Sequence, residues 1–321
     1  MPPVDRNHPI RGAASESTYS LMEFLADYPD DAVCLDFLWR KRFAPDGHTE
    51  TCPKCQRERR FHRVKSRPSY SCDSCGWHLH PLKGTIFEKS STSLRLWFYA
   101  IYLMTSTRCG VSAKHLEREL GVTYKTAWRM FNKIRNVLMA DDNGQLFGRV
   151  EVDETSVEGK PRKGYLPPGG TKFERYSAAN KLRERSRTTV IAAVERGGRV
   201  KATVLESRRG PAVPATVVEW VRPESIVYTD EWPAYNSLQR LGYDHSRVRH
   251  TTGEYVIGDA YTNTVEGFFG NLKTGIRGNY KKVSRRWLQG YLNEFCWRYN
   301  HRRTLDGRAM FETLLVRSTH A

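Results

Sequence analysis

Long apolar runs are scarce in this sequence, and so are acidic residues. The longest aromatic–aliphatic run, Leu96–Met104, has nine residues, whereas a membrane-spanning helix needs about 20. Residues 1–17 lack the basic and then apolar segments of a secretory signal peptide. The sequence therefore predicts a cytoplasmic protein that has no membrane partner.

Basic residues outnumber the acidic ones. The 321 residues include 52 Lys and Arg against 35 Asp and Glu, which gives a formal net charge of +17 at pH 7. Such an excess attracts polyanions and is typical of proteins that bind nucleic acids. Composition alone leaves an ordinary basic protein equally open, so the motifs must decide. A chain of this length is expected to hold about two domains and a small accessory module.

The cysteines do not have the pattern of a disulfide framework. Of seven cysteines, four form the pairs CPKC and CDSC, and the other three stand alone. Four thiolates with this spacing can close a tetrahedral site, so the sequence predicts a structural zinc ion bound by Cys52, Cys55, Cys72 and Cys75. A redox dithiol is the weaker alternative, because no thioredoxin-like pattern surrounds either pair.

The spacing of apolar residues divides the chain into four predicted segments. Residues 1–48 have helical spacing with a break near Pro29, and residues 49–90 form the predicted zinc ribbon. Residues 91–140 return to helical spacing and resemble a helix-turn-helix motif. Residues 146–321 contain several β-prone runs followed by helical ones, which predicts an α/β catalytic domain.

Three groups of cations are candidates for contacting DNA. In a helix-turn-helix the second helix enters the major groove, which makes Lys125 and Arg129 predicted DNA contacts. The segment 159–187, rich in glycine, proline and cations, is predicted to be a surface loop that contacts phosphates. The third group follows Glu266, after which no acid occurs until Glu294, and comprises Lys273, Arg277, Lys281, Lys282, Arg285 and Arg286.

Carboxylates occur where strands and a helix are predicted to begin or end. The strand RVEVDET places Glu151 and Asp153 on one face, because side chains alternate along a strand. The run IVYTD ends on Asp230, where an adjacent strand could bring it beside Asp153. Glu266 begins a predicted helix, and Lys273 lies seven residues further along the same face. Such an oxygen-rich pocket suits two magnesium ions and phosphodiester chemistry. Glu151 is the nearest alternative to Asp153.

Taken together, these motifs resemble a known family. The paired cysteines, VEVDET, YTDEWPAY, NTVEGFFGNLK and FCWRYNHR are similar to those of bacterial insertion-sequence transposases that join a zinc ribbon to a DDE catalytic core. The resemblance covers nearly the whole chain. It implies a ribonuclease-H-like α/β fold in which a mixed sheet is flanked by helices. It also implies that Asp153, Asp230 and Glu266 bind two Mg²⁺ or Mn²⁺ ions and that Lys273 contacts the DNA ends.

The resemblance also implies an activity and leaves alternatives open. The implied enzyme binds the terminal repeats of its element on double-stranded DNA, cleaves the ends and joins them to target DNA, acting as a homo-oligomer in the DNA complex. Some relatives have asparagine at the third metal ligand, so Asn263 and Asn271 are alternatives to Glu266. The alternative functions are a non-enzymatic DNA-binding regulator and a metal nuclease without joining activity.

Overall fold

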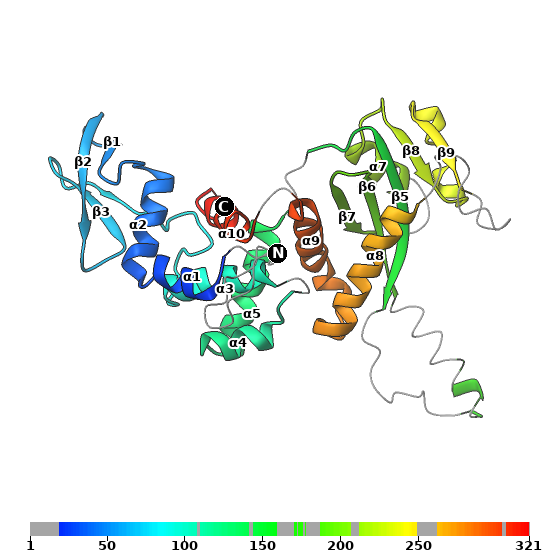
Figure 1. Cartoon of the computed structure of the whole chain (residues 1–321), viewed down its shortest axis with the longest axis horizontal. Helices are drawn as coiled ribbons and strands as arrows, with labels where there is room; N and C mark the ends of the chain where they lie inside the picture. Colours follow the sequence, from blue (N-terminus) through cyan, green and yellow to red (C-terminus); the bar gives the residue numbers. More distant parts are fainter. Residues whose placement is uncertain are drawn as a thin grey trace, which may run out of the picture. The chain divides into compact units, whose positions relative to one another are not determined.

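The computed structural model describes residues 19–107, 110–140, 144–158, 170–171, 173–175, 177, 187–206, 212–248, 262–303 and 306–320. These residues group into two compact units (Figure 1). One lies within Met1–Leu138 and Arg303–Ala321, and the other within Met139–Arg302. Among the described helices, none has both the length and the apolar character needed to cross a bilayer.

The first unit begins with two helices and a small sheet. The helices are α1 (Leu21–Asp27) and α2 (Asp31–Arg42), and the strands are β1 (Thr49–Cys52), β2 (Arg57–Val64), β3 (Ser69–Cys72) and β4 (His78–Leu79). The strands form an antiparallel sheet in the order β1-β2-β3-β4. Asp30 accepts hydrogen bonds from the backbone N–H groups of Ala32 and Val33, which starts α2 at the predicted break. Trp39 of α2 stacks on Tyr70 of β3 with 4.1 Å between ring centroids, so the helix supports the sheet.

The rest of the first unit is helical. Its elements are α3 (Leu94–Ser106), α4 (Ala113–Leu120), α5 (Tyr124–Lys133), a π-helical turn η1 (Ile134–Leu138) and α10 (Gly307–Arg317). Gly121 ends α4 in the left-handed conformation with φ of 62°, and Thr123 caps α5 by accepting from the Thr126 N–H at 3.3 Å. The α4–α5 pair thus has the two helices and tight turn predicted from the sequence.

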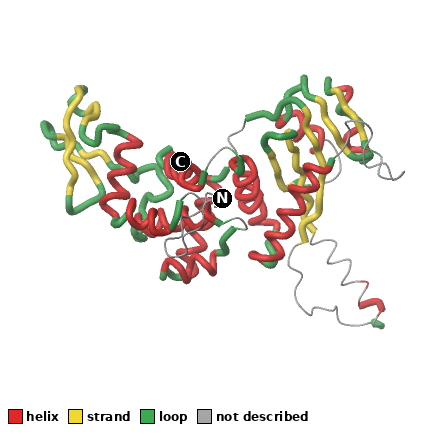
Figure 2. The backbone as a smooth tube through the Cα atoms, viewed as in Figure 1, coloured by secondary structure: helices red, strands yellow, loops and turns green. Residues whose placement is uncertain are grey.

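The second unit is built on a mixed five-stranded sheet (Figure 2). Its strands are β5 (Arg149–Glu158), β6 (Arg187–Glu195), β7 (Val200–Val204), β8 (Ile226–Thr229) and β9 (Asp244–Arg247). They lie in the order β7-β6-β5-β8-β9, with antiparallel pairing among β5, β6 and β7 and parallel pairing among β5, β8 and β9. The predicted α/β fold with a mixed sheet is confirmed, and this arrangement agrees with a ribonuclease-H-like core.

Helices lie against this sheet. They are α7 (Ala212–Trp220), the short 3₁₀ turns η2 (Pro233–Tyr235) and η3 (Gln239–Leu241), α8 (Asn263–Gly275), the π-helical turn η5 (Ile276–Tyr280) and α9 (Arg285–His301). Val150 and Val152 of β5 pack in one core with Val213 and Val217 of α7. Because side chains alternate along β5, Glu151 and Asp153 point to the opposite sheet face, where α8 packs.

Side chains of α9 pair with the edge strand β7. The Gln289 amide accepts from the Val204 N–H at 3.1 Å and donates to the Ala202 carbonyl at 3.2 Å. The Asn300 amide makes the same kind of reciprocal pair with the N–H and carbonyl of Val200. These contacts satisfy backbone groups that an edge strand would otherwise expose, and they attach α9 to the sheet.

The two compact units differ from the predicted segments at the C-terminus. We predicted a single catalytic domain over 146–321, but α10 lies in the first unit. Phe311 of α10 is fully buried, and its ring lies 5.6–6.4 Å from those of Tyr19, Phe24, Tyr28, Phe98 and Tyr102. Burying this apolar ring among aromatic partners places α10 there. Most of the predicted loop, namely 159–169, 172, 176 and 178–186, lies outside the described residues.

Candidate metal centres and nucleic-acid interface

The predicted cysteines converge at one end of the small sheet. The ligand atoms of Cys52, Cys55, Cys72 and Cys75 all lie within 4.8 Å of one another, and the Cys52 and Cys75 sulfurs are 3.6 Å apart. Tetrahedral zinc with Zn–S bonds of about 2.3 Å places its sulfurs about 3.8 Å apart. The four thiols therefore form a zinc-binding cysteine cluster that needs little rearrangement to take the ion.

Both CxxC pairs reach this geometry through the same backbone turn. After Cys55 and Cys75 the chain enters the left-handed region, at Gln56 with φ of 55° and Gly76 with φ of 68°. The N–H of Gln56 donates to the Cys52 carbonyl at 2.8 Å, and that of Gly76 donates to the Cys72 carbonyl at 3.1 Å. Each turn folds the second cysteine of its pair back towards the first, which explains why two such short segments can build a closed site.

Strand register brings two of the predicted carboxylates together. In the parallel β5–β8 pair, Glu151 is opposite Tyr228. Continuing that register by two residues places Asp153 opposite Asp230, which directly follows β8. Glu266 lies in the first turn of α8, the helix that packs on β5. The three acids thus come from two adjacent strands and one helix, as the sequence predicted.

The electrostatics of Asp153 indicate that these acids are neighbours. Burial, together with the charges of Glu154, Asp230 and Glu266, raises the pKa of Asp153 to about 7, although the Glu154 N–H opposes this shift by donating to Asp153 at 2.7 Å. The other two acids are oriented by nearby groups. Asp230 accepts from the Trp232 N–H at 3.0 Å, and Glu266 accepts from the Thr262 hydroxyl at 3.2 Å.

The spacing of the three acids differs from that of the thiols. Among described residues, the four cysteines are the set whose ligand atoms all lie within 4.8 Å, so at least one pair of these carboxylates is further apart. Two bridging cations span a wider set of ligands than one does. Asp153 and Asp230 are partly buried and Glu266 is exposed. Carboxylate oxygens from three elements are the donor set that hard divalent cations prefer.

Comparison with known proteins identifies the second unit. Residues 145–300 match the ISXO2-like transposase domain. The second unit is therefore similar to that domain. Those residues coincide closely with the unit Met139–Arg302. The chain is also similar to an uncharacterized protein in transposable element ISH50 of Halobacterium salinarum, with 28% identity over 248 residues, 74% of this chain and 77% of the relative. An uncharacterized transposase-like protein of Haemophilus influenzae is 30% identical over 83 residues, 26% of this chain and 66% of that protein.

The nearest alternative ligand in the ISXO2-like domain is already occupied. Glu151 is fully buried, and both of its oxygens accept hydrogen bonds from protein donors. Glu154 accepts from the Tyr235 hydroxyl at 2.7 Å, and its position in the strand places it on the other sheet face. The pKa of Asp153, by contrast, is raised by the charges of both Asp230 and Glu266.

A basic pocket of about 390 Å³ lies further along the same strand of the ISXO2-like domain. Its walls include β5 residues 155–157 and Ile276, and its cations are Arg187, Lys273, Arg277, Lys281 and Lys282. Among the described side chains that line it, none is acidic. Four of the five cations were predicted individually as DNA contacts, and Arg187 ends the segment 159–187 that was predicted to contact phosphates. A concave surface of this charge can accept phosphate groups.

The backbone at Lys281 is strained. Its φ of 63° and ψ of −58° belong to a rare γ-turn, closed by a 2.7 Å hydrogen bond from the Lys282 N–H to the Tyr280 carbonyl. This turn follows the π-helical turn η5, another irregularity that often marks functional sites. Strain of this kind persists where surrounding contacts impose it. Here the Tyr280 hydroxyl is anchored on Glu294, 3.2 Å away.

In the first unit, the predicted major-groove residues lie on an exposed helix face. Lys125 and Arg129 are both exposed and one helical turn apart on α5. Tyr124 beside them is 47% exposed. Their contact with DNA stays a prediction.

Two features of the second unit could not be decided from the sequence. We treated Glu151 as a competing ligand, because it shares a strand face with Asp153 and nothing in the sequence shows that it accepts hydrogen bonds from the start of α8. Arg187 was included in the predicted phosphate-contacting segment 159–187, but the sequence did not show that it begins β6 and lines the same pocket as Lys273.

Proposed function

We propose that this protein is a DNA transposase that binds the ends of its element, cleaves them and joins them to target DNA. The observation that carries the proposal is the convergence of Asp153, Asp230 and Glu266 within a domain similar to the ISXO2-like transposase domain. The pKa of Asp153 responds to both other acids, which supports these three residues as one metal-binding set.

The proposed chemistry is phosphoryl transfer. Two Mg²⁺ or Mn²⁺ ions, when bound by these carboxylates, supply an activated oxygen nucleophile and stabilise the leaving oxygen. Asp153, whose pKa is raised to about 7, must lose its proton to act as a ligand. Glu266 stands at a helix N-terminus, where the helix dipole favours its negative charge.

The basic pocket supports a role in positioning DNA. Lys273 lies two helical turns after Glu266 on α8, and its pocket holds four further cations. Phosphates bound there would be next to the phosphodiester bond at the carboxylates. Lys273 therefore acts as a phosphate contact, joined by Arg277, Lys281 and Lys282.

Recognition of the element ends is assigned to the first unit. The zinc ribbon strand β2 carries Arg57, Arg59, Arg60 and Arg63, and α5 presents Lys125 and Arg129 on an exposed face. Cations of this kind position a protein on the phosphate backbone, and helix residues read bases in the major groove. Joining two ends requires at least a homodimer in the DNA complex.

The experiment measures Mg²⁺-dependent cleavage and joining of labelled element ends. Glu266→Gln keeps the side-chain shape but weakens a metal ligand, so cleavage and joining should fall by at least about 100-fold while end binding in a gel shift stays within about twofold. Glu219→Gln, another exposed helix glutamate on α7, is the matched control and should retain the parent activity.

The same assay separates the alternatives. Pre-cleaved ends offered with a target plasmid should yield joined products; a nuclease would cut without joining, and a regulator would do neither. Asn263→Ala and Asn271→Ala should both keep activity. Loss of activity in either variant together with full activity in Glu266→Gln would transfer the third ligand role to that asparagine.

A further inference from the structure

A buried carboxylate connects the sheet to the start of the helix that carries Glu266. Glu151 Oε1 accepts from Arg196 Nε at 2.7 Å and from the Thr264 hydroxyl at 2.9 Å. Its Oε2 accepts from the backbone N–H groups of Thr264 at 2.8 Å and Val265 at 3.1 Å. Two donors on each oxygen satisfy the carboxylate, which is 0% exposed.

The contacts with Thr264 and Val265 do the work of a helix cap. The first N–H groups of a helix have no partner within it, and Thr262, the residue that precedes α8, makes no side-chain capping bond. Glu151 provides the missing acceptor from another element, 113 residues away in the chain. A carboxylate at this position also complements the positive end of the helix dipole.

The strand geometry connects this cap to the proposed metal site. Glu151 and Asp153 are two residues apart on one face of β5, which spaces them about 7 Å along the strand. The capped residues Thr264 and Val265 directly precede Glu266. Attaching the N–H groups of the first helical turn to Glu151 therefore sets where Glu266 stands relative to Asp153.

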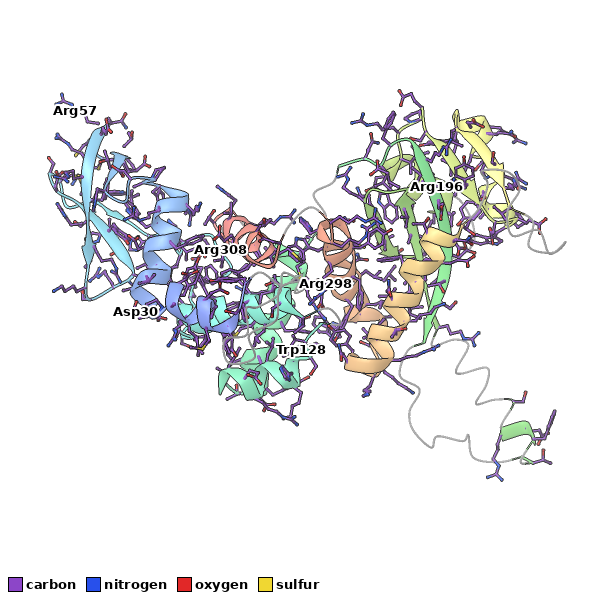
Figure 3. All side chains as sticks on the ribbon, in the orientation of Figure 1. Asp30, Arg57, Trp128, Arg196, Arg298 and Arg308 are labelled. Atoms are coloured by element: carbon purple, nitrogen blue, oxygen red, sulfur yellow. The ribbon has the colours of Figure 1, made fainter. Side chains whose placement is uncertain are left out.

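Arg196 completes the arrangement. Its guanidinium lies over the Tyr228 ring, 4.1 Å from the centroid, while its Nε donates to Glu151. Figure 3 labels Arg196 beside the first turn of α8. Tyr228 belongs to β8, the strand that leads to Asp230. One buried network thus touches all three elements that supply the carboxylates.

We propose that Glu151 is a positioning residue, which sets the distance of Glu266 from Asp153 through the first turn of α8 and thereby tunes divalent-metal affinity. The inference rests on the proposed function, because Glu266 must be a metal ligand. Glu151 is not a ligand itself, since its four protein donors leave no lone pair for a cation.

The test substitutes the acceptor and then one donor. All four partners of Glu151 are donors, so the amide nitrogen in Glu151→Gln would face an N–H or hydroxyl group. In Glu151→Gln, the Mg²⁺ concentration at the midpoint of end cleavage should rise by about 10- to 100-fold. The Mn²⁺ dissociation constant should rise by the same factor when it is measured by electron paramagnetic resonance on the zinc-loaded full-length protein without DNA. Thr264→Val should raise both by about two- to tenfold, whereas Thr264→Ser keeps the hydroxyl and should match the parent.

Glu294→Gln is the matched control. Glu294 is also 0% exposed and ion-paired, at 2.8 Å, to an arginine with the same 11% side-chain exposure. It lies on α9, so its loss should lower thermal stability while leaving the Mn²⁺ dissociation constant measured without DNA unchanged.

The outcomes separate the two proposals. A parent protein that neither binds Mn²⁺ nor cleaves with Mg²⁺ refutes the proposed function. A parent that does both, together with a folded Glu151→Gln of unchanged midpoint, refutes the positioning role. If Glu151→Gln does not fold, equal midpoints for Thr264→Val and Thr264→Ser refute it instead.

Discussion

Replacing Asp153 with asparagine should stabilise the metal-free protein while abolishing its activity. Burial and three neighbouring acids raise the pKa of this carboxyl from 3.8 to about 7. The native state therefore keeps a proton that the unfolded state loses, and wild-type stability falls as pH rises from 3.8 to about 7. The asparagine side chain does not titrate, so its contribution to the free energy of unfolding should not change across that pH range.

The expected gain in stability of Asp153→Asn follows from the pKa shift of Asp153. A difference of about three pKa units corresponds to a ceiling of about 4 kcal/mol, at about 1.4 kcal/mol per unit. The side chain is only partly buried, and water screens part of this cost, so about 1–2 kcal/mol is expected at about pH 8. For a unit of this size that corresponds to a rise in Tm of about 2–8 °C.

The assay compares thermal unfolding of the parent and Asp153→Asn at about pH 5.5 and pH 8, without added Mg²⁺ and without chelators that would remove zinc. The gap in Tm should widen at the higher pH. Adding Mg²⁺ at the higher pH should stabilise the parent and not the variant. A gap that stays the same at both pH values, or a variant less stable than the parent at pH 8, would refute the electrostatic reasoning. The exposed Glu219→Gln should show no pH-dependent gap.

Three further predictions concern other parts of the molecule. Cys72→Ser should release zinc, measured by a colorimetric chelator, and should weaken binding of the element ends. An unchanged affinity of the metal-free variant for these ends would show that the zinc ribbon does not contribute to their recognition. Lys281→Gln and Lys282→Gln should each reduce the slope of log affinity against log salt by about 0.9, and an unchanged slope would mean that the basic pocket does not contact phosphates. Gly275→Ala should destabilise the second unit by about 1–3 kcal/mol in urea unfolding, because the new methyl group would overlap the Phe295 ring; a stabilised variant would show that the ring moves freely.

The parts of this protein that depend on local spacing could be predicted from the sequence. Two CxxC pairs separated by sixteen residues predicted the cysteine cluster, because each pair forms its own turn. Alternation along residues 149–158 placed Asp153 on a single face, and the run ending at Asp230 predicted an adjacent strand. Glu266 was predicted at a helix start, and α8 does begin at Asn263.

The features that depend on distant partners are visible in the folded protein but could not be recognised in the sequence. Glu151 follows the same strand alternation as Asp153, and nothing nearby in the sequence distinguishes a metal ligand from a residue that caps a helix 113 positions later. The γ-turn at Lys281 is held by packing between η5 and α9, and no glycine marks it. Helix α10 joins the first unit because its Phe311 is buried among rings brought together from residues 19–102. Periodicity shows which face of an element is apolar, but burial against a particular partner depends on long-range packing that no local pattern specifies.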